Sequence, residues 1–430
     1  MHGEAAARAY AKGQLEAIGW VEAVAGKRRI DCDIEKVTSY VFGFGDDGAK
    51  SCQTEAEAAQ RAGLTGAFYS TADLPELPFQ PAGVYGVPGM VNFHPRKWVL
   101  GLAKAIPGDG SWIAEGVRAT GLVETQASGG QHIVQTTAGD VRARHVVVAT
   151  HFPIFDRAAF FARLVPVREN CVAGIVDASR APKDAFLAAD RSLSFRSAPC
   201  GEAGKRMLVL CGEKYRTGTV ADSGQMFAKV ADWGKETFGM QVRQTWATQD
   251  LTPPDGLPFI GRYSPASVSL WTACGFNQWG LSMGIRAAHI ITSLILHGQH
   301  EDAALYSPQR ASQLLPSSAW ALTKDNVEIA AHFVKGLVKP LLATVTPKQL
   351  QPGEATISSS LKYGRVAAYN DGGVLKCVSA TCTHLGCSVR WNDGEKSWDC
   401  SCHGSRFDLD GSVLHGPAVR PLPIVDVEDL

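Results

Sequence analysis

The chain has 430 residues, of which 45% are hydrophobic and 20% are charged, and its 42 basic residues balance its 42 acidic ones. A neutral chain of ordinary composition lacks the basic surplus that draws proteins to nucleic acids or anionic membranes. The apolar run at 290–296 is too short to span a bilayer, and residues 1–30 lack the pattern of a signal peptide. We therefore expect a cytoplasmic protein of two or three domains, with no nucleic-acid partner and no membrane span.

The first 310 residues alternate helical and strand patterns. Hydrophobic periodicity predicts a helix over 4–25, a strand over 37–42, and helices over 49–62 and 95–105. The apolar run at 145–150 is typical of a strand buried in a parallel sheet, which indicates α/β architecture. After a short strand over 269–273, a glycine-punctuated loop over 275–284 leads into a long apolar helix. The backbone amides at the start of that helix are suited to face an anion or a carbonyl group.

Composition divides the chain into three parts. Residues 1–310 form an α/β (or α+β) region, and residues 311–352 are interpreted as a linker with one helix over 326–337. Residues 353–430 are rich in strand and turn patterns, which predicts a small all-β domain. Six cysteines are scattered singly through the first part and are typical of reduced thiols. The other five lie between 377 and 402.

Two short loops in the all-β part carry matching cysteines and histidines. They read Cys382-Thr-His384-Leu-Gly-Cys387 and, after twelve residues, Cys400-Ser-Cys402-His403-Gly-Ser405. Two thiolates and two neutral imidazoles are the ligand set of a Rieske-type [2Fe-2S] cluster. A zinc site uses the same ligand types, but zinc does not explain two matching loops that each carry a glycine and an extra cysteine. The sequence therefore predicts a centre that transfers single electrons.

These loops resemble those of the Rieske proteins of cytochrome bc complexes, with Ser401 in place of the usual proline. The resemblance implies four cluster ligands, with Cys382 and Cys400 on one iron and His384 and His403 on the other. It also implies a disulfide between Cys387 and Cys402.

The surroundings of the cluster differ from that pattern at one position. By the resemblance, Ser405 provides a hydroxyl that hydrogen-bonds a bridging sulfide, and the segment Gly416-Pro417-Ala418 covers the cluster. Phe407 stands where a tyrosine usually hydrogen-bonds a ligand sulfur. Because such hydrogen bonds stabilise the reduced cluster, we expect a lower reduction potential.

Four segments of the first part form a second pattern: 93–97, 149–151, 248–261 and 275–284. Together they resemble the D-amino-acid-oxidase and sarcosine-oxidase group of FAD-dependent oxidoreductases, and the whole chain resembles a bacterial subgroup that carries a C-terminal Rieske domain. In that family the glycine-rich loop lies against the flavin ring, which implies contacts from Gly275, Phe276, Asn277, Gln278, Gly280 and Leu281. Without the resemblance, the same residues are interpreted as a glycine-rich cap on a helix.

Members of this group begin with a strand, a G-x-G-x-x-G turn and a helix, which hold the FAD pyrophosphate. This chain begins after that unit, so we expect an N-terminally incomplete FAD region and weak FAD binding. The stretch Gly43-Phe-Gly45-Asp-Asp-Gly48 matches the motif literally. However, Asp46 and Asp47 would stand where the phosphates approach, and we interpret the stretch as a surface turn.

The sequence thus predicts an oxidoreductase in which FAD takes two electrons from a small donor, such as an amine, and passes them singly to the [2Fe-2S] cluster and then to an unidentified acceptor. The alternative is a non-catalytic Rieske electron-transfer protein whose α/β part is a docking scaffold. A Rieske oxygenase is disfavoured, because His145 and His151 on one strand would be about 20 Å apart and could not share an iron. No pattern identifies a catalytic residue.

Overall fold

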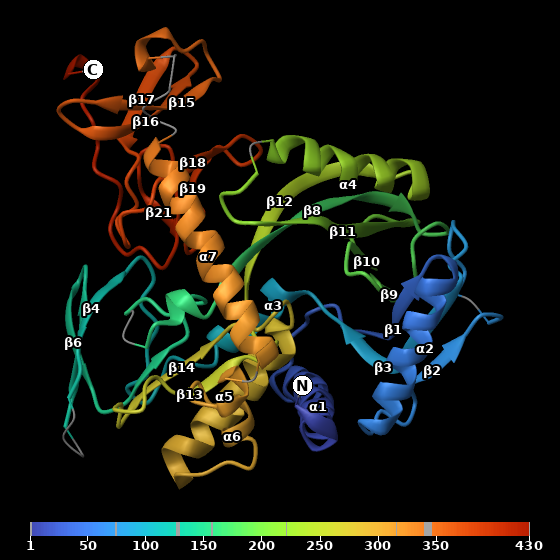
Figure 1. The fold of residues 1–430 in the computed structure, drawn as a ribbon. Coiled ribbons are helices and arrows are strands. Elements are labelled where there is room, and N and C mark those ends of the chain that lie inside the picture. Colours follow the sequence, from blue (N-terminus) through green and yellow to red (C-terminus); the bar gives the residue numbers. More distant parts are fainter. Residues whose placement is uncertain are drawn as a thin grey trace.

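The computed structural model describes residues 2–73, 75–125, 130–155, 158–220, 222–314, 316–338 and 346–429. The C-terminal strands, orange to red in Figure 1, gather at one end of the molecule beside a larger α/β region. The mixed fold predicted for the first part and the small β-rich C-terminal part are both confirmed. Part of the expected linker, 339–345, lies outside the described residues. No described helix is long and apolar enough to cross a membrane.

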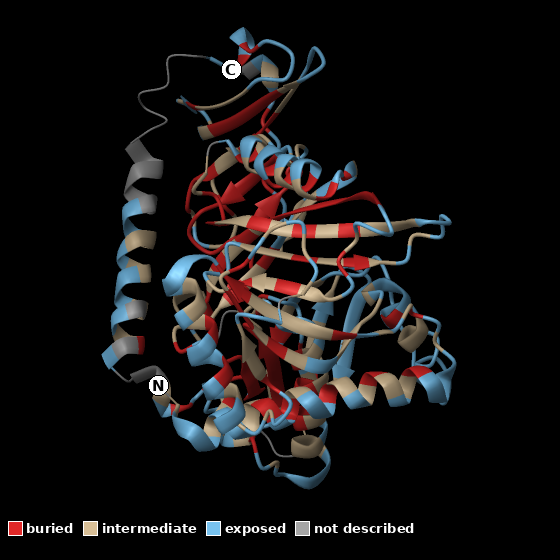
Figure 2. Cartoon of the chain, turned by 90° about the vertical axis from the view of Figure 1, so that its right-hand side faces the viewer, coloured by how far each residue is buried: buried red, intermediate tan, exposed pale blue. Residues whose placement is uncertain are grey.

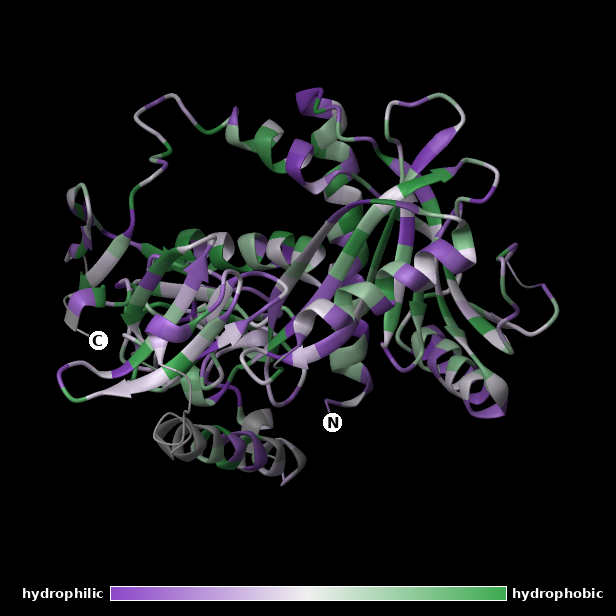
Figure 3. Cartoon of the chain, turned by 90° about the horizontal axis from the view of Figure 1, so that it is seen from above, coloured by the Kyte–Doolittle hydropathy of each residue, from purple (hydrophilic) through white to green (hydrophobic). Residues whose placement is uncertain are grey.

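Eight strands form the largest sheet, and hydrophobic stretches run along them in Figure 3. Their spatial order is β12 (Gln241–Thr252), β8 (Val165–Asp177), β11 (Lys205–Arg216), β10 (Leu193–Ala198), β9 (Ala185–Ala188), β1 (Glu35–Gly43), β3 (Gly83–Asn92) and β2 (Phe68–Ser70). All neighbours are antiparallel except β1 and β9. Since successive side chains point to opposite faces, Val172 and Leu210 lie on one face and Cys171 and Cys211 on the other.

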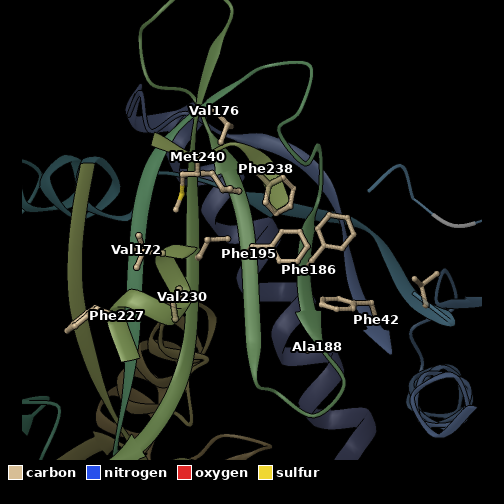
Figure 4. Packing of buried hydrophobic residues seen from close by; sticks show 14 residues of the cluster. Phe42, Val172, Val176, Phe186, Ala188, Phe195, Phe227, Val230, Phe238 and Met240 are labelled. Carbon is tan, nitrogen blue, oxygen red and sulfur yellow. The ribbon is translucent and has the colours of Figure 1, made fainter. Parts of the chain in front are cut away.

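Helix α4 (Ser223–Phe238) covers the face that carries Val172. The helix begins where the side chain of Asp222 accepts a hydrogen bond from the backbone N–H of Gln225 at 3.2 Å, and it ends at Gly239, whose φ is 67°. Figure 4 shows Phe186 and Phe195 side by side in the core beneath it, with ring centroids 4.8 Å apart. Burial of each such side chain stabilises the fold by about 1.5–3 kcal/mol.

A second sheet has the order β13 (Phe259–Arg262), β14 (Leu270–Cys274) and β7 (Val146–Val148). Strand β7 runs parallel to β14, which confirms the parallel pairing predicted for 145–150. All of β14 is buried. Figure 2 shows that buried residues gather in the interior of the molecule. Val147, in contrast, is 45% exposed, because its side chain points to the opposite face of the strand from that of Val148, which is 2% exposed. The prediction that this strand is buried is therefore wrong for the face that carries Val147.

Helix α5 (Gly280–His297) follows β14 and lies against α1 (Gly3–Arg28). The remaining elements of the region are α2 (Gly45–Arg61), α3 (Pro95–Ala103), β4 (Ala119–Val123), β5 (His132–Thr136), β6 (Gly139–Ala143), η1 (Phe160–Ala162), α6 (Ala303–Tyr306) and η2 (Ala311–Leu314). Helix α2 begins earlier than predicted, so the stretch 43–48, interpreted as a surface turn, joins the end of β1 to the first turn of α2. A Cβ on Gly43 would lie 2.3 Å from the backbone of Gly48, so these glycines let the strand and the helix meet.

Helix α7 (Pro316–Val338) is longer than the helix predicted over 326–337. After it come η4 (Pro347–Gln349), the antiparallel sheet β15 (Ala355–Ser360), β16 (Gly364–Asp371) and β17 (Val374–Ser379), the sheet β18 (Val389–Asn392), β19 (Ser397–Cys400), β20 (Arg406–Phe407) and β21 (Val413–His415), and η5 (Val427–Asp429). The core of this C-terminal part contains Trp398 and Phe407, which are fully buried.

Candidate cluster and flavin sites

The two cysteine-histidine loops of the C-terminal part have the same backbone hydrogen-bond pattern. In each, the N–H of the first cysteine donates at 2.8 Å to the carbonyl five residues later, and its own carbonyl accepts at 3.0 Å from the glycine four residues later. Those glycines, Gly386 and Gly404, have φ of 76° and 79°, a conformation that favours glycine. Both loops therefore place their cysteine and histidine in equivalent positions.

The structure brings the predicted cluster residues together. The four proposed ligands are Cys382 and Cys400, which are 2% and 1% exposed, and His384 and His403, whose ring centroids lie 5.0 Å apart. The Nδ1 atoms of both rings are buried. A disulfide between Cys387 and Cys402 joins the two loops.

The thiols of Cys382 and Cys400 interact directly. A hydrogen bond from Cys400 holds the pKa of Cys382 down to about 6, although burial opposes this shift. The same contact, together with burial, raises the pKa of Cys400, so the two sulfurs share one proton. Binding of both as thiolates releases that proton. Two buried sulfurs and two imidazoles at one place fit the donor set of a Rieske-type [2Fe-2S] cluster.

The residues around this donor set also have defined positions. The hydroxyl of Ser405 accepts a hydrogen bond from the N–H of Ala418 at 3.0 Å, which fixes the segment 416–418 over the second loop. Phe407 is fully buried and lies opposite Trp398 in the register of β19 and β20. Phenylalanine has no hydroxyl group, so residue 407 cannot donate a hydrogen bond to a ligand sulfur.

The α/β region contacts the second cluster loop. The ring of Phe161 lies 5.4 Å from that of His403. The side-chain amide of Gln249 donates to the carbonyl oxygen of Gly404 at 3.0 Å and accepts from the hydroxyl of Thr217 at 2.9 Å. A Cβ on Gly404 would lie 2.5 Å from that of Pro166. Only a glycine permits this approach, so the loop is shaped for the interface as well as for its ligands.

A second set of contacts fixes the C-terminal part farther from the cluster loops. At the start of α4, Ser223 donates its backbone N–H to Asp393 at 2.7 Å and its hydroxyl to Asn392 at 2.5 Å. Arg168 on β8 forms a buried ion pair with Glu395. Polar contacts thus hold the cluster-bearing part at two places, the second cluster loop and residues 392–395.

The glycine-rich loop predicted to face the flavin lies between β14 and α5. Gly275, Asn277 and Gln278 all have positive φ, of 71°, 49° and 74°. Helix α5 then begins at Gly280 without a side-chain cap, so amides of its first turn are available to an acceptor on a ligand. Leu281 is 50% exposed beside them. Uncapped amides next to apolar surface fit the polar edge and the face of a flavin ring.

This loop is anchored to the large sheet. The backbone N–H of Gln278 donates to Asp250 on β12, and its side-chain amide donates to Glu169 on β8 and accepts from Lys214 on β11, both at 2.9 Å. The N–H of Asn277 donates to the carbonyl of Leu251 at 3.3 Å. The loop therefore keeps its position relative to three adjacent strands.

A cavity of about 410 Å³ opens between this loop and the sheet. Its charged lining residues are Asp190, Arg191, Glu213, Lys214 and Asp250. They come from the loop between β9 and β10, from β11 and from β12, and no periodic pattern or motif in the sequence points to them. Groups of both signs around so small a space suit a compact molecule that carries an ammonium group, a carboxylate or both.

The two histidines near β7 do not form a metal site. His145 accepts a hydrogen bond from the indole N–H of Trp271 at 3.4 Å, whereas His151 lies 3.6 Å from Asp250. They have different partners, and β7 ends at Val148, so the distance expected for two histidines on one strand does not apply to His151.

Comparison with protein families identifies both parts. Residues 2–294 match the model of the FAD dependent oxidoreductase family, which is more than half of the chain, and residues 342–426 match the Rieske [2Fe-2S] domain. The chain belongs to the FAD-dependent oxidoreductase family. The two matches imply FAD and a [2Fe-2S] cluster as cofactors and electron transfer to a redox partner. The protein is thus a flavin- and Rieske-type oxidoreductase.

One relative matches along almost the whole chain, and another matches a short part of it. The protein YhfW of Bacillus subtilis (strain 168), whose name assigns it a Rieske 2Fe-2S cluster, is 27% identical over 98% of this chain and 81% of its own length. A cytochrome b6-f complex iron-sulfur subunit of Chlorobaculum thiosulfatiphilum is 47% identical over 14% of this chain and 32% of its own length.

Two solved structures share the fold of the α/β region. Glycine oxidase from Geobacillus kaustophilus aligns with a TM-score of 0.57 at 19% identity, over 69% of this chain and 82% of that one. L-proline dehydrogenase from P. horikoshii aligns with a TM-score of 0.56 at 14% identity, over 70% of this chain and 83% of that one. At these identities the likeness shows the fold alone.

Proposed function

We propose that the protein oxidises a small amine or amino acid in the cavity beside the loop 275–281 and passes the electrons within one molecule to a cluster held by Cys382, His384, Cys400 and His403. FAD, when bound, supplies the conversion of a two-electron oxidation into single-electron steps. In this proposal the region 1–310 oxidises the substrate, the domain 353–430 carries the electrons to an external acceptor, and 311–352 links them.

One observation carries this proposal: the route from the flavin-facing loop to the cluster loop is short and continuous. The N–H of Gln278 donates to Asp250, and the adjacent residue Gln249 donates to the carbonyl of Gly404, next to His403. Two hydrogen bonds, the side chains of Asp250 and Gln249 and the peptide bond between these two residues therefore connect the two loops. This contact couples the two parts directly, without a movement of the cluster domain.

The cavity supports the substrate class. Arg191 and Lys214 can hold a carboxylate, while Asp190, Glu213 and Asp250 can hold an ammonium group. The related folds named above include an oxidase of glycine and a dehydrogenase of proline, both of them amino acids. These residues bind and orient the substrate in the proposal, and no residue is assigned as the proton acceptor.

Rapid mixing tests the proposal. The protein carries its cluster and is kept in excess FAD, because the sequence predicts weak FAD binding. It is mixed without oxygen with glycine, sarcosine or L-proline, while flavin absorbance and the EPR signal of the reduced cluster are followed. We expect flavin bleaching, followed by cluster reduction. Gln249→Ala should leave flavin bleaching unchanged and slow cluster reduction several-fold, whereas Gln244→Ala, an exposed residue on the same strand, should change neither.

Two outcomes would contradict the proposal. Flavin reduction that leaves the cluster oxidised would show that the short route does not carry electrons. A protein whose cluster accepts electrons from chemical reductants, while no amine reduces the flavin, would instead be an electron carrier with an α/β docking scaffold.

A further inference from the structure

We propose that Cys171 and Cys211 form a reversible disulfide across the large sheet, beside the flavin-facing loop. Cys171 lies on β8 and Cys211 on β11, and the two residues are directly opposite each other in the antiparallel register. Their sulfur atoms are 2.7 Å apart and are not bonded. Both side chains lie on the face of the sheet that α4 leaves uncovered.

The distance favours a disulfide over a metal site. Directly opposite residues of antiparallel strands have Cα atoms about 4.5–5.5 Å apart, within the range of about 4.4–6.8 Å that a disulfide requires. A disulfide needs its sulfurs at about 2.0 Å, so a small rotation of the side chains forms the bond. Two thiolates on one tetrahedral zinc ion lie about 3.8 Å apart, since each Zn–S bond is about 2.3 Å. The pair is too close for that arrangement.

Access determines the order of the reaction. Cys171 is 2% exposed, whereas Cys211 is half-buried, so a low-molecular-weight disulfide meets Cys211 first. That disulfide forms a mixed disulfide with Cys211 and releases one thiol, and the sulfur of Cys171 then displaces the second thiol. The two cysteines lose two electrons and two protons, while one small disulfide is reduced to two thiols.

The disulfide would act on the flavin-facing loop. Glu169 lies two residues from Cys171, Lys214 lies three residues from Cys211, and both bind the side chain of Gln278 at 2.9 Å. A bond between the strands fixes the spacing of Glu169 and Lys214, so oxidation should hold the loop more rigidly. The thiol pair would thus report the redox state of small thiols to the loop, whichever substrate the protein uses.

The test uses the cluster-loaded protein in glutathione buffers of graded ratio, quenched with acid, alkylated while denatured and digested with trypsin. We expect a cross-link between peptides 169–180 and 207–214, because cleavage after Arg168, Arg180, Arg206 and Lys214 isolates one cysteine in each. The cross-linked fraction should rise from about one tenth to about nine tenths as [GSH]²/[GSSG] falls about a hundredfold. Hydrogen exchange of residues 275–280 should be slower in the oxidised protein.

Matched variants test whether the cross-link and its effect depend on Cys211 and not on another thiol. Cys211→Ser should abolish the cross-link and the change in exchange, whereas Cys200→Ser, which removes another half-buried thiol, should alter neither. Absence of the cross-link in the most oxidising buffer, or a glutathione adduct on Cys211 that Cys171 does not displace, would overturn the proposal. A cross-link without any change in exchange at 275–280 would overturn its effect on the loop.

Discussion

Arg168 of the α/β region is completely buried and forms an ion pair with Glu395 of the cluster-bearing domain. Glu395 also lies 3.1 Å from Arg406, so one carboxylate serves two buried guanidinium groups. Since removal of one partner leaves a buried charge uncompensated, Glu395→Ala should lower the free energy of unfolding by about 3–5 kcal/mol in a denaturant titration. Glu236→Ala, at an exposed position on α4, should change it by less than about 0.5 kcal/mol.

A double variant checks this cause. If the loss arises from the uncompensated charge, Arg168→Leu combined with Glu395→Leu should be more stable than Glu395→Ala alone. Equal stability of the wild type and Glu395→Ala would show that the pair does not hold the domain.

Gly404 and Gly386 offer a matched comparison within one motif. Their φ values are nearly equal, but a Cβ on Gly404 would meet Pro166 and Gln249, whereas nothing lies within 4 Å of one on Gly386. Gly386→Ala should therefore cost about 1–2 kcal/mol of stability, the price of left-handed backbone. Gly404→Ala should cost about 1–3 kcal/mol more and should slow cluster reduction. Denaturant titration measures the stability of each variant, and rapid mixing measures the rate of cluster reduction. An equal loss of stability in the two variants would argue against the contact of Gly404 with the α/β region.

The proposed cluster ligands can be tested by EPR. Cys382→Ser should abolish the signal of the reduced cluster, because a serine hydroxyl does not replace the soft thiolate. Cys377→Ser is the control, since Cys377 is equally buried but lies on β17, where it pairs with Ala368. It should keep the signal and lose about 1 kcal/mol of stability. Loss of the signal in the control would overturn the ligand assignment.

Phe407→Tyr should raise the reduction potential of the cluster. The phenol would add a hydrogen-bond donor beside the ligand sulfurs, and such a bond stabilises the reduced state. Protein-film voltammetry measures the potential, and Ser405→Ala should shift it downward in the same experiment. A fall or no change in Phe407→Tyr would show that the hydroxyl does not reach a sulfur from β20.

The lowered pKa of His415 predicts how the stability of the protein changes as the pH falls. Burial, followed by the charges of Arg406, His151 and Arg168, lowers the pKa of His415 from 6.5 to about 4, while Asp399 opposes the shift. Between pH 6.5 and pH 4 the unfolded chain binds a proton that the folded protein does not, so stability is lost as the pH falls through this window. The loss is at most about 3 kcal/mol.

The variant His415→Gln isolates this contribution. Its unfolding temperature should fall less than that of the wild type between pH 6.5 and pH 4, because glutamine does not titrate. Parallel curves for the two proteins would assign the acid sensitivity to other groups.

The cluster residues could be predicted from the sequence because their chemistry is local. Each loop is six residues long, and its hydrogen bonds join residues four or five positions apart, so the spacing of Cys382, His384 and Gly386 already determines the shape. The glycine-rich loop before α5 could be located from the spacing of its glycines. Its shape is not local in the same sense, because the backbone N–H groups of Asn277 and Gln278, both at positive φ, donate to Leu251 and Asp250 on β12.

The contacts that connect these sites were decided only by the tertiary structure. Gln249 and Gly404 are 155 positions apart, Arg168 and Glu395 are 227 apart, and Cys171 and Cys211 are 40 apart. Their meeting depends on strand order, on register and on how the C-terminal domain docks. The local sequence around one residue does not determine strand order, register or docking. A shift of one position in register, for example, would turn Cys171 to the opposite face of the sheet.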